Sequence, residues 1–203
     1  MSRFTGPRLR KVRALGVSLP GLTRKVSERR PYPPGQHGQA RRKLSDYGLR
    51  LREKQKLRFN YGLTERQLRI LVDEARHLPG VTGDVILELL ERRLDNVVWR
   101  AGFAATIPAA RQLVSHGHVR VNGRRLDIPS ARLSPGDAVT LRDGTFENAH
   151  VKDSLAAAAS VRPAWLTWDE AARAATMRTL PDPASVLLEV NPQYVVEFYS
   201  RSL

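Results

Sequence analysis

Apolar residues recur with a helical period through the first half of the chain, and this pattern predicts four helices. Ser45 can cap the first, over residues 46–60, and Thr64 opens a capping box, TERQ, for the second. Asp95 is expected to cap the short fourth helix. The second and third helices each carry one apolar stripe, formed by Leu68, Leu71, Val72 and Ala75 and by Val85, Ile86, Leu89 and Leu90. These stripes predict the core of a small helical bundle.

Within residues 106–141 the apolar period changes from helical to alternating, which predicts one helix followed by short strands. Thr106 can cap this helix, and Gly117 can stop it. The alternation that follows places Val119 and Val121 on one face of a strand and polar residues on the other. The apolar stripe of the helix is formed by Ile107, Ala110 and Val114.

The pair Asn122-Gly123 predicts a β-hairpin, because both residues tolerate the positive φ of a type I′ turn. Residues 124–128 are expected to return as the partner strand, and residues 138–141 to follow the Pro135-Gly136 turn as a further strand. Polar and cationic residues of the preceding helix and of the hairpin can converge on one patch: Arg111, Ser115, His118, Arg120, Arg124 and Arg125. Such a patch suits a phosphate backbone.

The last third of the chain gives weaker signals. Two alanine-rich stretches, residues 156–160 and 169–177, are compatible with helices. Asn191-Pro192 is a good helix start, and Val195, Phe198 and Tyr199 would share one face of that helix. We therefore expect a final helix that docks on the rest of the protein.

The charge balance indicates a polyanionic partner. The 203 residues, 41% of them hydrophobic, suffice for one or two domains with a core, yet they carry a net charge of +14. Residues 1–60 hold 17 of the 34 Lys and Arg but only three of the 20 acids, so the remainder is neutral. This uneven distribution of charge favours nucleic acid over a membrane surface as the partner. No apolar stretch approaches the roughly eighteen residues of a spanning helix. The N-terminus also lacks the apolar core of a secretory signal.

Residues 1–44 combine these cations with many prolines and glycines, so regular structure is expected to be sparse. We interpret the segment as an extended basic arm that is ordered mainly on its partner. A solvated tail and a nuclear address are the alternative interpretations of such a charge run. The turn-rich stretch PYPPGQHGQ favours the arm.

The sequence offers little for catalysis or metal binding. It contains no cysteine, which excludes disulfides and thiolate ligands. His116 and His118 could hold a metal only with a third ligand, and their cationic surroundings favour contacts with RNA instead. Ser115 beside His116 is no nucleophile pair, and no Walker loop is present. Aromatic residues make up 6% of the chain, too few for a base-stacking sheet, so backbone geometry should dominate recognition.

Four segments together carry a family resemblance. The run RLDNVVWRAGFAATIPAARQLVSHGHVRVNGRRLDIPS resembles the RNA-binding domain named after small-subunit ribosomal protein S4. The segments RRPYPPGQHGQ, LREKQKLRFNYGLTERQ and VVEFYSR resemble the ribosomal protein S4 family itself, and the likeness covers nearly the whole chain. That domain also occurs in pseudouridine synthases, a tRNA synthetase and small stress proteins, and the flanking segments discriminate among these.

The resemblance implies an α+β fold: a mostly helical domain with an embedded S4-type domain, in which two helices pack on a small, mainly antiparallel sheet, and a basic extended N-terminal arm. The predicted division is an arm at residues 1–44, a helical region at 45–92, the S4-type domain at 93–153, and a segment at 154–203 that packs back on the helical region. It also favours extended chain over helix at residues 165–169.

We assign the RNA contacts to residues of the arm, the first long helix and the hairpin unit. The predicted site residues are Arg8, Arg10, Arg41, Arg42, Lys43, Arg50, Arg52, Lys54, Lys56, Arg111, Ser115, His116, His118, Arg120, Asn122, Arg124 and Arg125. No catalytic residue, cofactor or metal is expected. Many bacterial members of the family carry a cysteine-rich zinc knuckle near the N-terminus, whereas residues 5–30 here contain no cysteine, so we predict no zinc.

The resemblance further implies a non-enzymatic rRNA-binding protein of the small subunit. It would bind a multi-helix junction in the five-prime domain, nucleate assembly and influence translational accuracy. Its other partners would be neighbouring small-subunit proteins and its own mRNA, with no membrane, and its location the cytoplasm of a bacterium or a chloroplast stroma. The domain of an RNA-modifying enzyme and a stress protein for stalled ribosomes are the alternatives.

Overall fold

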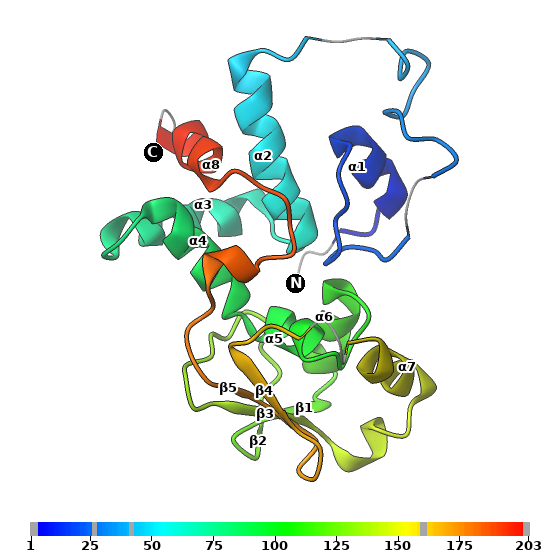
Figure 1. Ribbon diagram of the computed structural model, residues 1–203, viewed down its shortest axis with the longest axis vertical. Helices are drawn as coiled ribbons and strands as arrows, with labels where there is room; N and C mark the ends of the chain where they lie inside the picture. The colour runs from blue at the N-terminus through cyan, green and yellow to red at the C-terminus, as the bar shows by residue number, and fades with distance from the viewer. Residues whose placement is uncertain (1–3, 26–27, 41–42, 159–161, 201–203) are drawn as a thin grey trace. The chain divides into compact units, whose positions relative to one another are not determined.

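The computed structural model describes residues 4–25, 28–40, 43–158 and 162–200, and these residues form an α+β protein (Figure 1). Within them lie eight α-helices and one antiparallel sheet of five strands. The chain divides into two compact units, the first made of residues 1–87 and 186–203 and the second of residues 88–185. The predicted fold class is confirmed.

The first unit is helical and contains α1 (Arg8–Leu15), α2 (Asp46–Asn60), α3 (Glu65–His77) and α8 (Pro192–Ser200), while α4 (Thr82–Glu91) begins in it. Two predicted caps are confirmed. The Ser45 hydroxyl accepts a hydrogen bond from the backbone N–H of Gly48, and Thr64 and Gln67 form both bonds of the capping box. The predicted stripe of α3 is buried, and α8 packs on α2 and α3.

The expectation of an extended arm was wrong for its first half. Residues 8–15 form a helix whose Val12 and Leu15 are buried, and Leu19 and Leu22 beyond it are also buried. The backbone N–H of Gly21 donates to Asn60 Oδ1 at 2.9 Å, which ties this segment to α2. The apolar positions are spaced for one helical face, but the surrounding arginines and a proline obscured them in the sequence.

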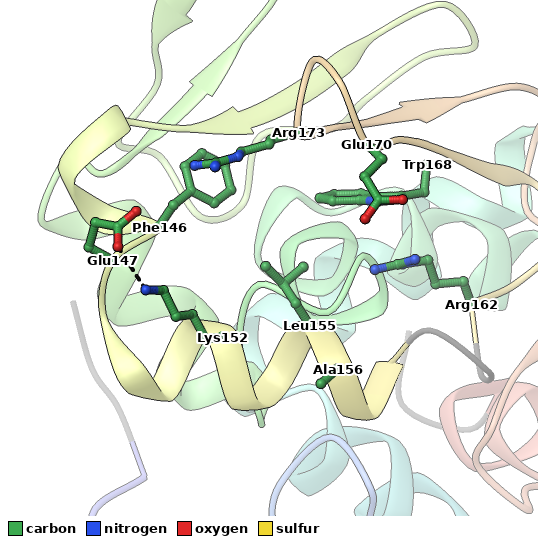
Figure 2. A pocket seen from close by; sticks show the side chains of 9 residues that line it. All are labelled: Phe146, Glu147, Lys152, Leu155, Ala156, Arg162, Trp168, Glu170 and Arg173. Carbon is green, nitrogen blue, oxygen red and sulfur yellow. Dashed lines mark hydrogen bonds and ion pairs between the residues drawn. The ribbon is translucent and has the colours of Figure 1, made fainter.

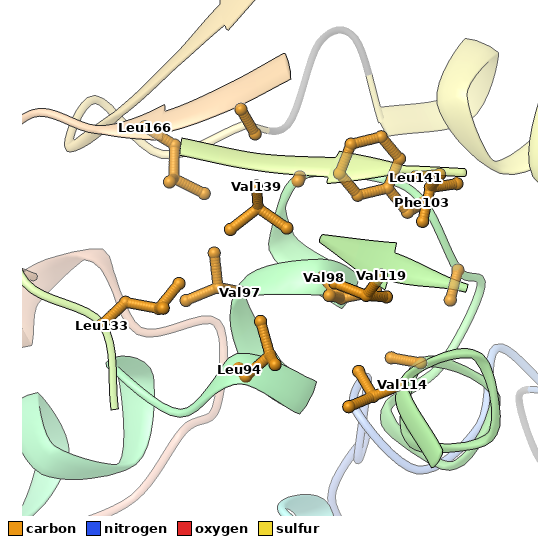
Figure 3. Close-up of a cluster of buried hydrophobic side chains, with 14 of the residues drawn as sticks. Leu94, Val97, Val98, Phe103, Val114, Val119, Leu133, Val139, Leu141 and Leu166 are labelled. Atoms are coloured by element: carbon orange, nitrogen blue, oxygen red, sulfur yellow. The ribbon is translucent and has the colours of Figure 1, made fainter. Parts of the chain in front are cut away.

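The second unit packs helices on the sheet. It contains α5 (Leu94–Arg100), α6 (Ile107–Ser115), α7 (Ala149–Ala158), the 3₁₀ turns η1 (Asp143–Thr145) and η2 (Pro183–Ser185), and strands β1 (Val119–Val121), β2 (Arg124–Arg125), β3 (Ala138–Leu141), β4 (Leu166–Asp169) and β5 (Ala174–Met177). The strand order is β2-β1-β3-β5-β4. Figure 3 shows α5 residues Leu94, Val97 and Val98 directed at Val119 and Val139 of the sheet, where the core lies.

The C-terminal stretch differs from its prediction. Residues 154–185 belong to the second unit, and only the last part of the predicted segment packs on the helical unit. The alanine-rich stretch 169–177 is not a helix, because Ala174 and Ala175 form strand β5 and pair with β3 and β4. The extended alternative for residues 165–169 agrees with β4. The return strand of the hairpin is shorter than predicted, since only Arg124 and Arg125 form β2.

Asp95 is buried and does not cap a helix as predicted. The N-cap position of α5 is Arg93, whose side chain forms no capping bond. The first N–H groups of α5 are instead satisfied by the connecting loop, since Leu94 N donates to Ala131 O at 2.8 Å and Asp95 N to Pro129 O at 3.1 Å. This frees the Asp95 carboxylate, which is 1% exposed, to accept hydrogen bonds from arginine side chains.

Candidate nucleic-acid interface

The hairpin of β1 and β2 presents a row of arginines to solvent. Arg120 and Arg125 are directly paired across the two strands and share one face of the sheet, whereas Arg124 pairs with Val121 and projects from the other face at the exposed tip of the hairpin. Like charges that face each other across a strand pair destabilise the sheet, and a bound anion would offset that repulsion. Among the described residues, the side chains of Arg120 and Arg124 have no hydrogen-bond or ion-pair partner, whereas Arg125 has one exposed contact, with Asp127 Oδ2 at 3.4 Å.

Arg125 also packs against the end of α6. Gly117, which follows this helix with φ +72°, packs against Arg125, whose guanidinium atoms lie 2.5–2.7 Å from where a Cβ would stand. Ser115 and His116 are exposed beside it, and the His116 and His118 ring centres are 6.2 Å apart. The absence of a side chain at Gly117 therefore lets Arg125 pack on the loop between His116 and His118.

Arg142 belongs to this surface but was missed in the sequence. Its backbone N–H donates to His118 O at 2.8 Å, which places the exposed residue beside the β1 edge. It directly follows the last residue of β3, and the alternation of the strand could have extended to it. We define the hairpin patch as Arg120, Arg124, Arg125 and Arg142 with Ser115, His116 and His118. His118 Nδ1 also lies 3.3 Å from the Thr145 hydroxyl.

Arg111 does not join the hairpin patch, contrary to the sequence prediction. Its Nε and one terminal nitrogen donate to Asp95 Oδ2 at 3.0 and 2.6 Å. Arg93 holds the same carboxylate through both oxygens at 3.1 and 2.9 Å. A bidentate guanidinium on a buried carboxylate is a strong, geometrically fixed interaction. Arg111 therefore fixes α6 to α5.

Asn122 also has an internal role, because both ends of its side-chain amide are occupied. Its Nδ2 donates to Asp137 Oδ1 at 2.7 Å, and its Oδ1 accepts from the backbone N–H of Ala138 at 2.9 Å. Its φ of 50° matches the predicted type I′ geometry. The residue thus fixes the hairpin on which the arginines stand, and only one N–H and one lone pair of its amide remain for other partners.

The four cations predicted on α2 are largely engaged within the first unit. Arg50 Nε bonds Glu197 Oε2 at 2.7 Å, and Arg52 Nε donates to Leu15 O at 3.0 Å. Lys54 reaches Glu65 Oε2 at 2.8 Å, and Lys56 reaches Glu53 Oε1 at 2.6 Å. Lys54 and Lys56 are only 4% and 8% exposed. Burial and internal partners therefore argue against a direct contact of these two lysines with RNA.

The residues Arg50, Lys54, Glu65, Glu197 and Tyr199 form the α2 cluster. Burial and the hydrogen bonds among them shift the pKa of Arg50, Glu65 and Tyr199. The hydrogen bond to Glu197 raises the pKa of Arg50. Burial opposes ionisation of Glu65, but hydrogen bonds from Lys54 and Tyr199 outweigh it and lower its pKa. Burial, together with the hydrogen bond to Glu65 at 2.7 Å, raises the pKa of Tyr199. The cluster joins α2, α3 and α8.

The predicted arm residues lie in different settings. Arg8 and Arg10 are exposed on α1, although one Arg8 terminal nitrogen is 3.5 Å from Leu22 O. Lys43 is exposed. Arg41 and Arg42 lie outside the described residues. Exposed cations of α1 therefore remain candidates for a second RNA-facing surface of the first unit.

The residues that the structure describes form neither a metal-binding cluster nor a membrane-spanning helix. They contain no group of three or more His, Asp or Glu side chains placed to hold a metal ion. None of the helices in this part of the chain combines the length and the apolar character needed to cross a bilayer. The fold and the hairpin patch thus define a protein of the nucleic-acid-binding class.

Comparison with known proteins gives the family. The model for the ribosomal protein S4/S9 N-terminal domain matches residues 3–91, and the S4 domain model matches residues 92–139. The chain is 54% identical to small ribosomal subunit protein uS4 of Methylobacillus flagellatus and 53% identical to uS4 of Thermosynechococcus vestitus, with 100% of both chains covered in each case. It is 50% identical to uS4c of Cyanophora paradoxa over 99% of this chain and 100% of the relative. The chain belongs to the ribosomal protein S4 family.

Proposed function

We propose that this chain is a structural constituent of the small ribosomal subunit that binds small-subunit rRNA directly and has no catalytic role. Relatives of the same length are small-subunit ribosomal proteins by name. The observation that carries the proposal is the hairpin patch, where Arg120 opposes Arg125 and two arginines have no internal partner among the described residues. An arrangement that costs stability in the free protein is explained if phosphates occupy it.

The mode of binding is recognition of backbone shape. Guanidinium forks can bridge phosphates, and arginines held at fixed positions on the hairpin match phosphates held at fixed positions in folded RNA. We infer a multi-helix junction of the five-prime domain as the target, because helices that converge bring phosphates from several strands together. Binding the folded junction better than its unfolded forms raises the population of the folded state. The protein would thereby nucleate assembly and support accurate decoding.

The proposed partners are this rRNA, neighbouring small-subunit proteins and the protein's own mRNA. The location is the ribosome, in a bacterial cytoplasm or a chloroplast stroma. No residue of the hairpin patch is arranged as a nucleophile with its base, which supports a non-enzymatic role.

A salt titration of rRNA binding tests the hairpin patch. The variant Arg120→Gln with Arg124→Gln should bind small-subunit rRNA about tenfold more weakly for each arginine replaced, because hydrogen bonds to charged groups contribute roughly 1.5–3 kcal/mol. The slope of log K against log salt should fall by roughly 0.7–0.9 for each phosphate that is no longer neutralised. Arg178→Gln, an exposed arginine of the same unit outside the patch, is the matched control. Equal slopes for all three proteins would remove the hairpin from the interface.

Sucrose-gradient fractionation tests the ribosomal assignment. The chain should sediment with the small subunit, whereas a stress protein for stalled ribosomes would follow the large subunit. Incubation with rRNA and nucleoside mass analysis should reveal no modified base. A modified nucleoside that depends on the chain would overturn the structural role in favour of an RNA-modifying enzyme.

A further inference from the structure

A pocket of about 480 Å³ opens in the second unit, away from the residues that form the hairpin patch (Figure 2). It lies between α7, which contributes Lys152 and Leu155, and the β4–β5 hairpin, which contributes Trp168 and Arg173. Its volume falls in the range of roughly 300–1,000 Å³ typical of small-ligand sites. Leu155 lies between the two ends of the pocket, so apolar surface separates two charged ends.

Each end of the pocket holds an arginine on an aromatic ring. The Arg162 guanidinium lies 4.4 Å from the Trp168 ring centre, and the Arg173 guanidinium lies 5.4 Å from that of Phe146. Arg162 Nε donates to Ala101 O at 3.0 Å. The terminal nitrogens of Arg162, and the whole guanidinium of Arg173, have no hydrogen-bond partner among the described residues. Stacking fixes the planes of both guanidinium groups, and their outer edges remain available to an anion.

The backbone at Arg173 is also unusual. Its φ is 47°, in the left-handed region, at the end of the turn that joins β4 to β5. Hairpin loops commonly include one left-handed residue, and Arg173 closes the loop between β4 and β5 in this conformation. Here the conformation brings the Arg173 side chain over Phe146.

The two carboxylates of the pocket differ in their availability. Glu147 is held by Lys152 at 2.7 Å, and that hydrogen bond lowers its pKa. Glu170, on the turn between Trp168 and Arg173, is exposed and has no hydrogen bond or ion pair among the described residues. Once the Glu147–Lys152 pair is set aside, the pocket offers two guanidinium groups and one carboxylate to a ligand.

We propose that this pocket binds one unpaired nucleotide of RNA, with guanine preferred. The proposal rests on the function proposed above. The nucleotide phosphate accepts hydrogen bonds from Arg162 and Arg173, and the base lies against Leu155, because the Trp168 ring is already covered by Arg162 and packs edge to face on Phe103. Guanine is preferred because its Watson–Crick edge carries two adjacent donors, which match the two oxygens of Glu170. Unpaired bases are recognised in this way, by stacking and by hydrogen bonds to their exposed edges.

The groups of the pocket favour this ligand over a protein segment. A ligand of this pocket needs hydrogen-bond donors for the Glu170 carboxylate and an anionic group for the two guanidinium groups, and a nucleotide has both. The net charge of the three unpaired groups is positive, which favours a phosphate-bearing ligand.

Chemical probing of the complex tests the proposal. Full-length protein is bound to small-subunit rRNA, and unpaired guanines are modified at N1 and N2. The wild-type chain should protect at least one guanine that is exposed again with Glu170→Gln, a variant that removes one acceptor charge from a solvent-exposed turn. Arg173→Gln should weaken binding about tenfold and lower the salt slope by roughly 0.7, the value for one single-stranded phosphate.

Arg162→Lys sharpens the test without removing charge. It keeps an alkyl chain over Trp168 and deletes the guanidinium fork, so it should reduce affinity while the protein remains folded by circular dichroism. Arg178→Gln is again the matched control and should retain both the protection and the slope.

Three possible results distinguish failure of the pocket proposal from failure of the proposed function. Unchanged protection and slope in the three pocket variants, with rRNA binding retained, would overturn the pocket and leave the function standing. Variants that bind rRNA normally but fail to enter small subunits would assign the pocket to a protein partner and overturn it as an RNA site. A wild-type chain that binds small-subunit rRNA no better than arbitrary RNA would overturn both.

Discussion

Helix α2 and the β1–β2 hairpin both carry several cations close together in the sequence, but the α2 cations have internal partners and the hairpin arginines are exposed to solvent. On α2, Lys54 and Lys56 are buried with carboxylate partners; Lys54 links α2 to α3 through Glu65, and Lys56 pairs with Glu53 of its own helix. On the hairpin, Arg120 and Arg124 are exposed, and no internal partner is found for them in the described part of the chain. A high density of positive charge in the sequence therefore says little about which cations are available to RNA. Exposed cations without an internal partner, such as Arg120 and Arg124, are the better candidates for the proposed interface.

The largest effect in this comparison is expected at Asp95, where two arginines are engaged internally. Asp95→Ala would leave Arg93 and Arg111 as buried charges without their carboxylate. Removing one partner of a buried ion pair costs about 3–5 kcal/mol. Urea unfolding of the second unit should show a decrease of this size. Asp127→Ala, whose pair with Arg125 is exposed, should change the free energy of unfolding by less than about 1 kcal/mol. A small decrease at Asp95 would mean that its arginines find other partners.

Lys54→Met separates buried from exposed cations more directly. The lysine donates to Glu65 and lies 4.8 Å from the Phe198 ring centre. Methionine keeps the apolar length of the side chain, so the variant should lose about 1–3 kcal/mol of unfolding free energy from the missing charged hydrogen bond. The salt slope of rRNA binding, measured on folded protein, should not change. A slope reduced as much as in the Arg120 and Arg124 variant would show that Lys54 contacts phosphate.

The parts of the fold that the sequence predicted are those with local causes. The caps at Ser45 and Thr64 and the turn at Asn122-Gly123 depend on residues within four positions, and each is found where predicted. Strands β4 and β5 were ambiguous because the alanines of β5 gain strand structure only by pairing with β3 and β4. The internal partners of the α2 cations could not be predicted for the same reason, since Arg50 meets a glutamate 147 residues away.

Asn122 tests whether the hairpin patch needs a rigid support. Asn122→Ala removes two hydrogen bonds and puts at φ 50° a residue that tolerates the left-handed region less well than asparagine, so it should destabilise the second unit by about 1–2 kcal/mol. Asn122→Gly also loses the hydrogen bonds but tolerates the turn, and it should cost less. Thermal unfolding measures both. Under conditions in which both variants are fully folded, the affinity of each for rRNA should be within about threefold of the wild-type affinity. A larger decrease in affinity with Asn122→Gly would restore the amide as a group that binds RNA.

The smallest effect concerns the acid response of the α2 cluster. Because the folded pKa of Glu65 is lowered, its ionised form stabilises the fold at neutral pH. That contribution is present above the unfolded pKa of about 4.3 and is lost as pH falls through the lower folded value. Glu65→Gln should therefore flatten the decrease in stability below about pH 5, measured as the urea midpoint against pH. Asp73→Asn, at an exposed carboxylate of α3, is the control and should keep the wild-type decrease. If Glu65→Gln kept it too, the ion pair with Lys54 would contribute nothing measurable, and burial of Lys54 would be explained by packing alone.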